Sequence, residues 1–208
     1  MPRIRLGGRR GACTAAATAC ATIGCALVVS GLPTAASSRL PPTPAATAPR
    51  AAPPASPARA LPQAQPQRVR VPAVGLDVET RPVGLDDDGS IALPDDPDHA
   101  GWFTHTPTPG QNGNAVVVGH VDSESGPAAF HGLGALRPGD RVLVDRERGP
   151  AAEFTVTGTA VHGRDAFPSH AVYGPTTEPR LTLVTCADWD PERRTYRANL
   201  VVRARLTP

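Results

Sequence analysis

A chain of 208 residues is long enough for one domain of ordinary size and additional segments at its ends. Its formal net charge of +2 is unevenly distributed, because no Asp or Glu precedes Asp77 and seven of the 21 arginines precede residue 68. Beyond that point acidic residues outnumber arginines, which excludes nucleic-acid binding by a basic, aromatic-rich domain surface.

The N-terminal segment is typical of a membrane anchor. Residues 1–10 hold four arginines, and no charged residue follows before Arg39. Such a stretch can cross a hydrocarbon core of about 30 Å, and a basic flank stays in the cytoplasm. We predict a cytoplasmic tail at 1–10 and a transmembrane signal anchor at 11–32, which makes the chain a single-pass protein of the cell membrane with an extracytoplasmic domain. A cleaved signal peptide that ends near Ala36 fits the same residues.

The next segment, 33–67, is rich in proline and alanine. Its ten prolines alternate with Ala, Thr, Ser and Gln, a composition that buries too little apolar surface to offset the entropy of an ordered chain. We predict a disordered linker with extended, polyproline-like stretches, which would space the following domain from the membrane.

The segment 68–208 has the pattern of a mostly-β domain. Short apolar runs of period two, rich in Val, Thr and Leu, are interrupted by Gly, Pro and Asp. The predicted strands are 68–74, 78–83, 114–119, 141–146, 152–162, 180–186 and 195–206, and the predicted short helices are 127–136 and 168–173. Seven or eight strands indicate a barrel or a sandwich, since either architecture protects its sheet edges, and we favour the barrel.

Cys186 is the single cysteine of this domain, because the other three lie in the apolar N-terminal stretch. In an exported protein most thiols pair as disulfides, and a lone thiol calls for an explanation. A small buried core residue is one explanation. The run 181–185 and the polar segment that follows Cys186 predict instead a thiol at a strand end beside a loop, where nucleophiles are often presented.

Two further residues could assist this thiol, which needs a base or a cation nearby to react near neutral pH. His120 ends the predicted strand 114–119 in the same context as Cys186. Arg197 opens the last predicted strand, and the alternation of side chains turns it away from the face of its two neighbours. Alone, each residue has an ordinary structural explanation, and their combination indicates catalysis.

Four segments of the domain occur in the order found in sortases, and the domain resembles that family over about residues 68–206. The four segments are 118–122, 132–140, 181–186 and 196–199. Two more, 82–86 and 101–102, make the chain most similar to the class F sortases of actinobacteria.

This resemblance implies an eight-stranded β-barrel of the sortase type with a few short helices, in which His120, Cys186 and Arg197 are the catalytic residues. Thr185 is expected to support the oxyanion or the substrate. Asp122 is expected either to orient His120 or to occupy a turn. His131, which stands where relatives often have an aromatic residue, is either a second imidazole near the site or an exposed helix residue.

The reaction that the resemblance implies is transpeptidation through a thioacyl intermediate. The family cleaves a C-terminal sorting signal of the Leu-Pro-X-Thr-Gly type after Thr and transfers the protein to a cell-wall amine. The expected partners are therefore proteins that carry a sorting signal and a cell-wall precursor with an amine, and we expect a monomer. No cofactor and no metal are expected, since the acidic cluster 86–88 lacks the alternating ligands of a calcium loop and the histidines lack zinc-like spacing.

Two kinds of alternative remain at this point. Another cysteine enzyme of the cell envelope is disfavoured, because papain-like peptidases place Cys before His and L,D-transpeptidases carry a Ser-His-Gly-Cys string that this chain lacks. A non-enzymatic β-domain that binds a wall polymer or a protein partner, with Cys186 merely buried, is an alternative of a different class.

Overall fold

The structure, a computed structural model, describes residues 58–208. The predicted tail and anchor and most of the predicted linker lie outside the described residues. Within the described part of the chain, no helix has both the length and the apolar character needed to cross a membrane.

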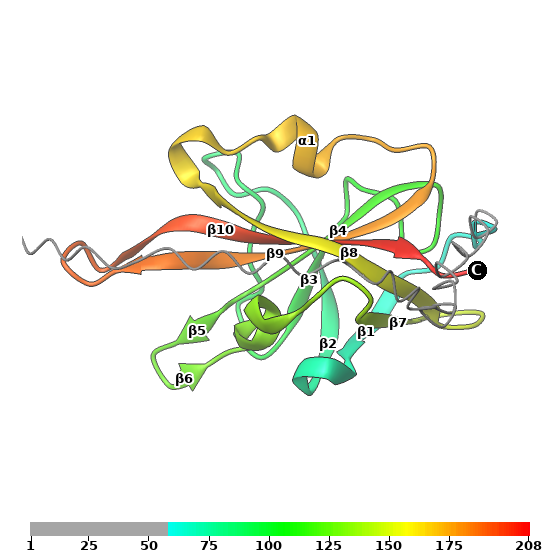
Figure 1. The fold of residues 1–208 in the computed structure, drawn as a ribbon, viewed down its shortest axis with the longest axis horizontal. Coiled ribbons are helices and arrows are strands. Elements are labelled where there is room, and N and C mark those ends of the chain that lie inside the picture. The colour runs from blue at the N-terminus through cyan, green and yellow to red at the C-terminus, as the bar shows by residue number, and fades with distance from the viewer. Residues whose placement is uncertain (1–57) are drawn as a thin grey trace, which may run out of the picture. The chain divides into compact units, whose positions relative to one another are not determined.

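Eight strands form a closed barrel in the order β1-β2-β3-β4-β9-β10-β8-β7 (Figure 1). A separate two-stranded sheet joins β5 and β6. In chain order the strands are β1 Pro66–Val71, β2 Leu76–Val83, β3 Ala100–Phe103, β4 Gly113–Gly119, β5 Asp122–Ser123, β6 Gly126–Pro127, β7 Arg141–Arg146, β8 Ala152–Gly163, β9 Pro179–Asp190 and β10 Thr195–Leu206. The predicted mostly-β barrel is confirmed.

The barrel interior is built by the alternation of side chains along its strands. Leu181 and Leu183 of β9 point inward and join the main core cluster, whereas Val184 belongs to a second cluster on the outer face. Phe130 and Phe154 are the largest fully buried side chains, and the burial of each contributes about 1.5–3 kcal/mol. This core holds the strands that carry the predicted site in a fixed register.

Strand β4 is buried along its whole length, which explains its continuous apolar sequence. Its side chains at 115 and 117 face the interior, and those at 116 and 118 face the outer cluster. The outer cluster is covered by residues of the β2–β3 connection and of the segment after β8, namely Ile91, Leu93, Phe167, Val172 and Tyr173. These two segments therefore flank the outer face of β4 and β9.

Four short helices complete the described chain, and they are η1 Pro72–Val74, η2 His131–Ala135, η3 Arg164–Ala166 and α1 Ser169–Tyr173. The predicted strand 68–74 was too long at its C-terminal end, because Pro72 has no N–H for the sheet and begins η1. The predicted helix 127–136 shortens to η2, and the predicted helix 168–173 corresponds closely to α1.

The folded part begins before residue 68. Leu61 and Ala58 pack against the main core, and Ala64 is buried. The backbone N–H of Leu61 donates to the carbonyl of Gly110 over 2.8 Å. The last ten residues of the predicted linker 33–67 therefore belong structurally to the barrel domain, in contrast to the predicted boundary at 68.

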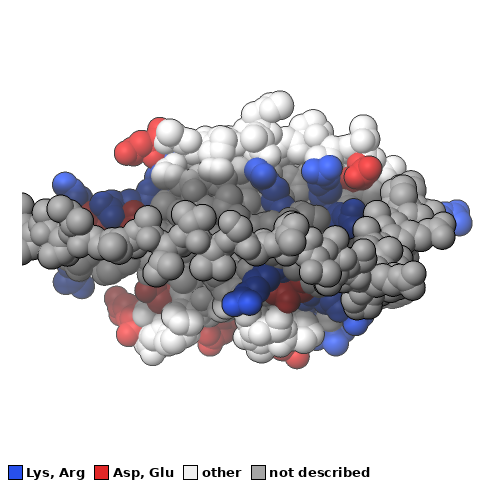
Figure 2. Space-filling view, in the orientation of Figure 1, with Lys and Arg blue, Asp and Glu red and all other residues white. Residues whose placement is uncertain are grey.

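Charged side chains are mixed on the visible surface. In Figure 2, basic and acidic side chains are interspersed on the face that is not covered by grey atoms, and neither sign forms a continuous field there. Several of the pairs are in contact, such as Arg70 with Asp145 at 2.6 Å and Arg141 with Glu153 at 2.5 Å.

Candidate active site

Cys186 lies within β9, and the prediction that it ends a strand is wrong. The strand continues to Asp190, because β10 pairs with it along almost its whole length. The cross-strand partners run from Arg180 opposite Arg205 to Asp190 opposite Thr195. The pairing of β9 with β4, however, stops at Val184. The thiol therefore lies where β9 leaves β4 and continues into the β9–β10 hairpin, which projects from the barrel (Figure 1). Cys186 is a free, half-buried thiol.

His120 directly follows β4, as predicted. The parallel strands β4 and β9 pair Val118 with Val184, and His120 and Cys186 each come two residues later. Both side chains therefore continue the same row on the outer face. The Nε2 atom of His120 lies 2.9 Å from the carbonyl oxygen of Pro94. Because a carbonyl only accepts, this bond requires the proton on Nε2 and leaves Nδ1 of the neutral ring as an acceptor.

Arg197 lies on the same outer face of the neighbouring strand. Strand β10 pairs Asn199 with Cys186, and Arg197 is two residues before Asn199. Its Nη2 atom donates to Oδ1 of Asp188 over 2.9 Å, and the two side chains are 55% and 48% exposed. This hydrogen bond raises the pKa of Arg197. His120, Cys186 and Arg197 thus come from three adjacent strands and share one face.

The surroundings of the thiol favour its neutral form. Burial is the largest cause and raises the pKa of Cys186, the positive charge of Arg164 lowers it, and the negative charge of Asp122 raises it. Arg164, in η3, is thus the cation that acts on the thiol in this structure. Its Nη1 atom donates to the backbone carbonyl of Tyr196 over 3.5 Å. No local sequence signal distinguishes Arg164, because its position depends on how the segment after β8 folds over the barrel.

Asp122 was expected either to orient His120 or to occupy a turn, and in the structure it lies in β5 and binds Tyr196. Its carboxylate accepts a hydrogen bond from the Tyr196 hydroxyl, and this bond links β5 to β10. Burial, followed by the hydrogen bond to Asp122, raises the pKa of Tyr196 to about 12. The side chain of His120 is held by Pro94 instead. Asp122 therefore fixes the position of the β5–β6 hairpin beside the site, and the predicted orientation of His120 by Asp122 is not seen in the structure.

Thr185 lies inside the barrel and is 3% exposed. Its hydroxyl donates to the carbonyl of Gly119 over 2.8 Å. Thr185 precedes Cys186 and Gly119 precedes His120. This hydrogen bond, on the interior side of the sheet, therefore fixes the two predicted catalytic positions relative to each other. Support of an oxyanion by Thr185 stays a prediction.

Gly119 is required by a close contact. A Cβ atom at this position would lie 2.8 Å from Cγ of Phe130, whose ring is fully buried. The Phe130 N–H in turn donates to the His120 carbonyl over 2.8 Å. The backbone around His120 is therefore fixed on both sides. His131, the other imidazole considered, is exposed, and its Nδ1 atom lies 3.2 Å from the Val121 carbonyl.

Residues 58–208 contain no group of three or more His, Cys, Asp or Glu side chains arranged to hold a metal ion. The site offers a thiol, an imidazole and the Arg197 guanidinium on one face, and the Arg164 guanidinium of η3 acts on the thiol through its charge.

Comparison with known proteins identifies the domain. The family model described as a sortase domain matches residues 69–207. Sortase A of Listeria monocytogenes has a similar structure, with a TM-score of 0.53, 20% sequence identity, and coverage of 70% of this chain and 89% of that chain. The SrtA sortase of Actinomyces oris gives a TM-score of 0.54 with 19% identity over 73% of this chain and 88% of its own. Sortase C1 of Streptococcus agalactiae gives 0.53 with 17% identity over 68% and 67% of the two chains. A search of curated protein sequences found no match.

Proposed function

The chain belongs to the sortase family of cysteine transpeptidases, and we propose that Cys186 is its nucleophile, His120 its general acid and Arg197 the residue that holds the substrate carbonyl. The observation that carries this assignment is the register of β4, β9 and β10, which puts the three side chains on one face. Because the domain belongs to an enzyme family, the alternative of a non-enzymatic binding domain is not supported.

The first half of the reaction forms a thioester. The Cys186 thiolate attacks the carbonyl carbon of a peptide bond, and the carbonyl electrons move to its oxygen, where Arg197 donates hydrogen bonds. The tetrahedral intermediate collapses, the C–N bond breaks, and protonated His120 gives a proton to the leaving amine. For this step Arg197 must exchange Asp188 for the substrate oxygen.

The second half transfers the acyl group. An amine attacks the thioester carbon, and neutral His120 accepts the proton that the amine loses. An amide forms, the C–S bond breaks, and Cys186 returns as a thiolate. Because burial raises the thiol pKa, most of the resting enzyme carries a neutral thiol, and the positive charge of Arg164 increases the reactive fraction.

For the substrate we propose a C-terminal sorting signal of the Leu-Pro-X-Thr-Gly type, cut between Thr and Gly, with a cell-wall amine as acceptor. The support is the resemblance to class F sortases in the segments 82–86 and 101–102, which meet where Pro82 of β2 pairs with Trp102 of the parallel strand β3. The domain would act as a monomer on substrate proteins that are themselves exported.

Mass spectrometry of the protein mixed with a sorting-signal peptide tests this function. We expect the enzyme to gain the mass of the acyl fragment, and to lose it when an amine such as triglycine is added. Cys186→Ala should show no adduct. A matched peptide with Thr and Gly exchanged is the control. If the native protein alkylates readily at Cys186 but forms no adduct with the sorting peptide, the proposed substrate is wrong.

We further propose that residues 11–32 anchor the enzyme in the cell membrane with its barrel outside the cytoplasm. The support is the basic segment 1–10 followed by an uncharged stretch. In membrane fractions extracted with carbonate, the full chain should remain in the pellet, and a chain without residues 1–32 should not. A shortened mature chain in the soluble fraction would show a cleaved signal peptide instead.

A further inference from the structure

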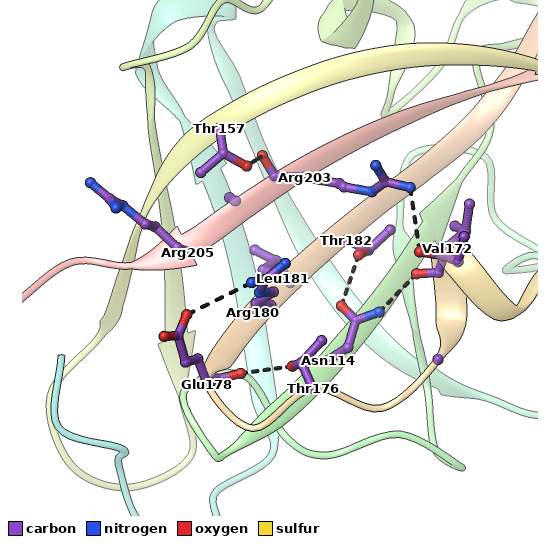
Figure 3. Close-up of a pocket in the computed structure, with 13 residues that line it drawn as sticks. Asn114, Thr157, Val172, Thr176, Glu178, Arg180, Leu181, Thr182, Arg203 and Arg205 are labelled. Carbon is purple, nitrogen blue, oxygen red and sulfur yellow. Dashed lines mark hydrogen bonds and ion pairs between the residues drawn. The ribbon is translucent and has the colours of Figure 1, made fainter. Parts of the chain in front are cut away.

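A concave region lies on the outer face of β9 and β10, away from Cys186. It is a pocket of about 270 Å³, and its wall opposite the strands is the segment from Ala171 to Glu178 (Figure 3). Arg180 at the start of β9 lines the pocket, six residues before Cys186. At about 3.3 Å per residue, the two positions are roughly 20 Å apart along the strand.

The wall of the pocket is fixed in place by a buried amide. The side chain of Asn114 is 5% exposed, and its Nδ2 atom donates to the Val172 carbonyl over 2.8 Å. Its Oδ1 atom accepts a hydrogen bond from Thr182, also over 2.8 Å. These bonds connect the end of α1 to β4 and β9, so the pocket is part of the folded structure (Figure 3).

The lining of the pocket is positively charged. Three arginines, Arg180, Arg203 and Arg205, line the pocket together with a single carboxylate, that of Glu178. Glu178 lies 3.7 Å from the Arg180 guanidinium, and 60% of its side chain is exposed. Arg203 donates only to a neutral group, the Ala171 carbonyl, over 3.3 Å. Arg205 has no ion pair among the described residues.

The arrangement of these arginines costs stability. Arg205 and Arg180 are direct cross-strand partners in the antiparallel β9–β10 pair, and Arg203 is two residues from Arg205 on the same face. Like charges at directly opposed positions destabilise a sheet. Nothing in the catalytic reaction uses this charge, because the arginines lie toward the Pro179 end of β9 and the Leu206 end of β10, at pairing positions four or six residues along the strand from Cys186. A bound anion would remove the repulsion.

We propose that this pocket binds a phosphate-bearing anion of extended shape, such as a pyrophosphate or a phosphodiester. Guanidinium groups bind phosphate oxygens through paired hydrogen bonds. Figure 3 shows the Arg203 side chain directed toward Val172, that of Arg205 directed the opposite way, and that of Arg180 beside Glu178. Arginines spread in this way around a pocket suit two or more charged oxygens at a distance from one another better than a single small ion such as chloride.

Isothermal titration calorimetry with the full-length chain at low salt tests the proposal. One arm uses inorganic pyrophosphate, and the other uses glycerophosphoglycerol, the water-soluble headgroup of an anionic lipid. We expect saturable binding of at least one of them, weakened more than tenfold in the double variant Arg180→Gln/Arg205→Gln. The control is Arg148→Gln, which removes an exposed arginine of the β7–β8 turn and should bind as the unchanged protein does.

The two arms identify the source of the phosphate, since preference for pyrophosphate indicates a soluble or nucleotide-like anion and preference for the headgroup indicates a lipid. Absence of binding in both arms, or equal affinity in the double variant, would overturn the proposal. Circular dichroism of each variant shows that the fold is retained, and the binding readout does not depend on peptide cleavage.

Discussion

At the scale of single residues, the surroundings of Cys186 favour its neutral thiol, and the guanidinium group of Arg197 is bound by Asp188. Burial raises the pKa of Cys186, and Arg164 opposes this effect. Arg197, the residue proposed to bind the substrate, is bound to Asp188 in the structure. The proposed reaction therefore requires two changes, namely deprotonation of the Cys186 thiol and release of Arg197 from Asp188.

Arg164 is expected to tune the reactivity of the thiol. The substitution Arg164→Gln removes the positive charge that lowers the pKa of Cys186. The pKa of the thiol therefore rises, and at any pH below this pKa a smaller fraction of the thiol is deprotonated. We expect alkylation by iodoacetamide at neutral pH to slow by roughly two- to tenfold. The measurement is the alkylation rate as a function of pH. Because Arg164 is exposed, the difference should shrink at high salt. An unchanged pH profile would show that Arg164 has no effect on the reactivity of the thiol.

Arg197 is expected to act through the geometry of its guanidinium group. Lys has a point charge without the planar fork, so Arg197→Lys should lose about a hundred- to a thousandfold in peptide cleavage rate, the usual cost of one oxyanion donor. Circular dichroism should be unchanged. Arg148→Lys, at an exposed turn, is the control. Near-native turnover in Arg197→Lys would show that only its charge matters.

Asp188 is expected to compete with the substrate for Arg197. An exposed ion pair of this kind is screened by water and contributes little, so we expect its removal to gain at most about fivefold. We expect Asp188→Asn to raise kcat/KM within this limit. Asp188 has a φ of 59°, a region that Asn adopts more readily than most residues, so the hairpin should keep its shape. A loss of activity would instead make Asp188 part of the catalytic machinery.

At the scale of elements, the sequence predicted strands best where their own side chains decide the structure. The apolar run that ends at Gly119 was placed almost to the residue, because burial on both faces leaves a continuous apolar pattern. Strand β3 was missed, since four residues with a glycine give no periodic signal. The extension of β9 to Asp190 was also missed, because exposed polar residues there are held in a strand by pairing with β10.

The residues of the site that could be predicted are those that lie in local sequence motifs. His120, Cys186 and Arg197 lie in short motifs that can be recognised in the sequence itself. The strand register brings the three residues to one face. Arg164 and Tyr196 could not be predicted as neighbours of the thiol, because the segment after β8 and the β5–β6 hairpin bring their contacts together only in the folded chain.

Gly119, at the end of β4, is expected to be sensitive to substitution by alanine. In Gly119→Ala the new methyl group meets the buried Phe130 ring at 2.8 Å, so either the ring or the strand end before His120 must move. We expect a loss of about 1–3 kcal/mol in the free energy of unfolding and a fall in cleavage rate.

Urea denaturation measures this loss, and Gly158→Ala in β8 is the matched control because no atom lies within 4 Å of its new methyl group. In the double variant Gly119→Ala/Phe130→Leu the smaller side chain should relieve the clash, so the two changes together should cost less than their sum. Strict additivity would mean that the ring and the glycine are not coupled.

At the scale of the whole molecule, the N-terminal boundary of the barrel domain affects its stability. Residues 58–67 contribute Leu61 and buried Ala64 to the domain, and the Arg146 guanidinium donates to the Pro62 carbonyl over 2.8 Å. The composition of this segment resembles that of the proline-rich residues before it, so the sequence alone does not show where packing begins.

A chain that begins at residue 68 is therefore expected to be less stable than one that begins at residue 58. The lost apolar burial and hydrogen bonds together correspond to roughly 2–5 kcal/mol. Urea denaturation of the two chains measures the difference. Equal stability of the chains from 58 and 68 would show that the contacts of Leu61 and Ala64 are energetically neutral.

The closure of the barrel also determines how this enzyme must refold. Thr185 and Gly119, whose hydrogen bond ties the two halves of the site together, are 66 residues apart, and the Arg70–Asp145 pair that joins β1 to β7 spans 75 residues. Domains dominated by such distant pairings fold in milliseconds to seconds, because long loops must close before the contacts form. No local segment can present His120 beside Cys186. In a refolding experiment, the ability to form the acyl adduct should therefore appear together with the burial of the core and not before it.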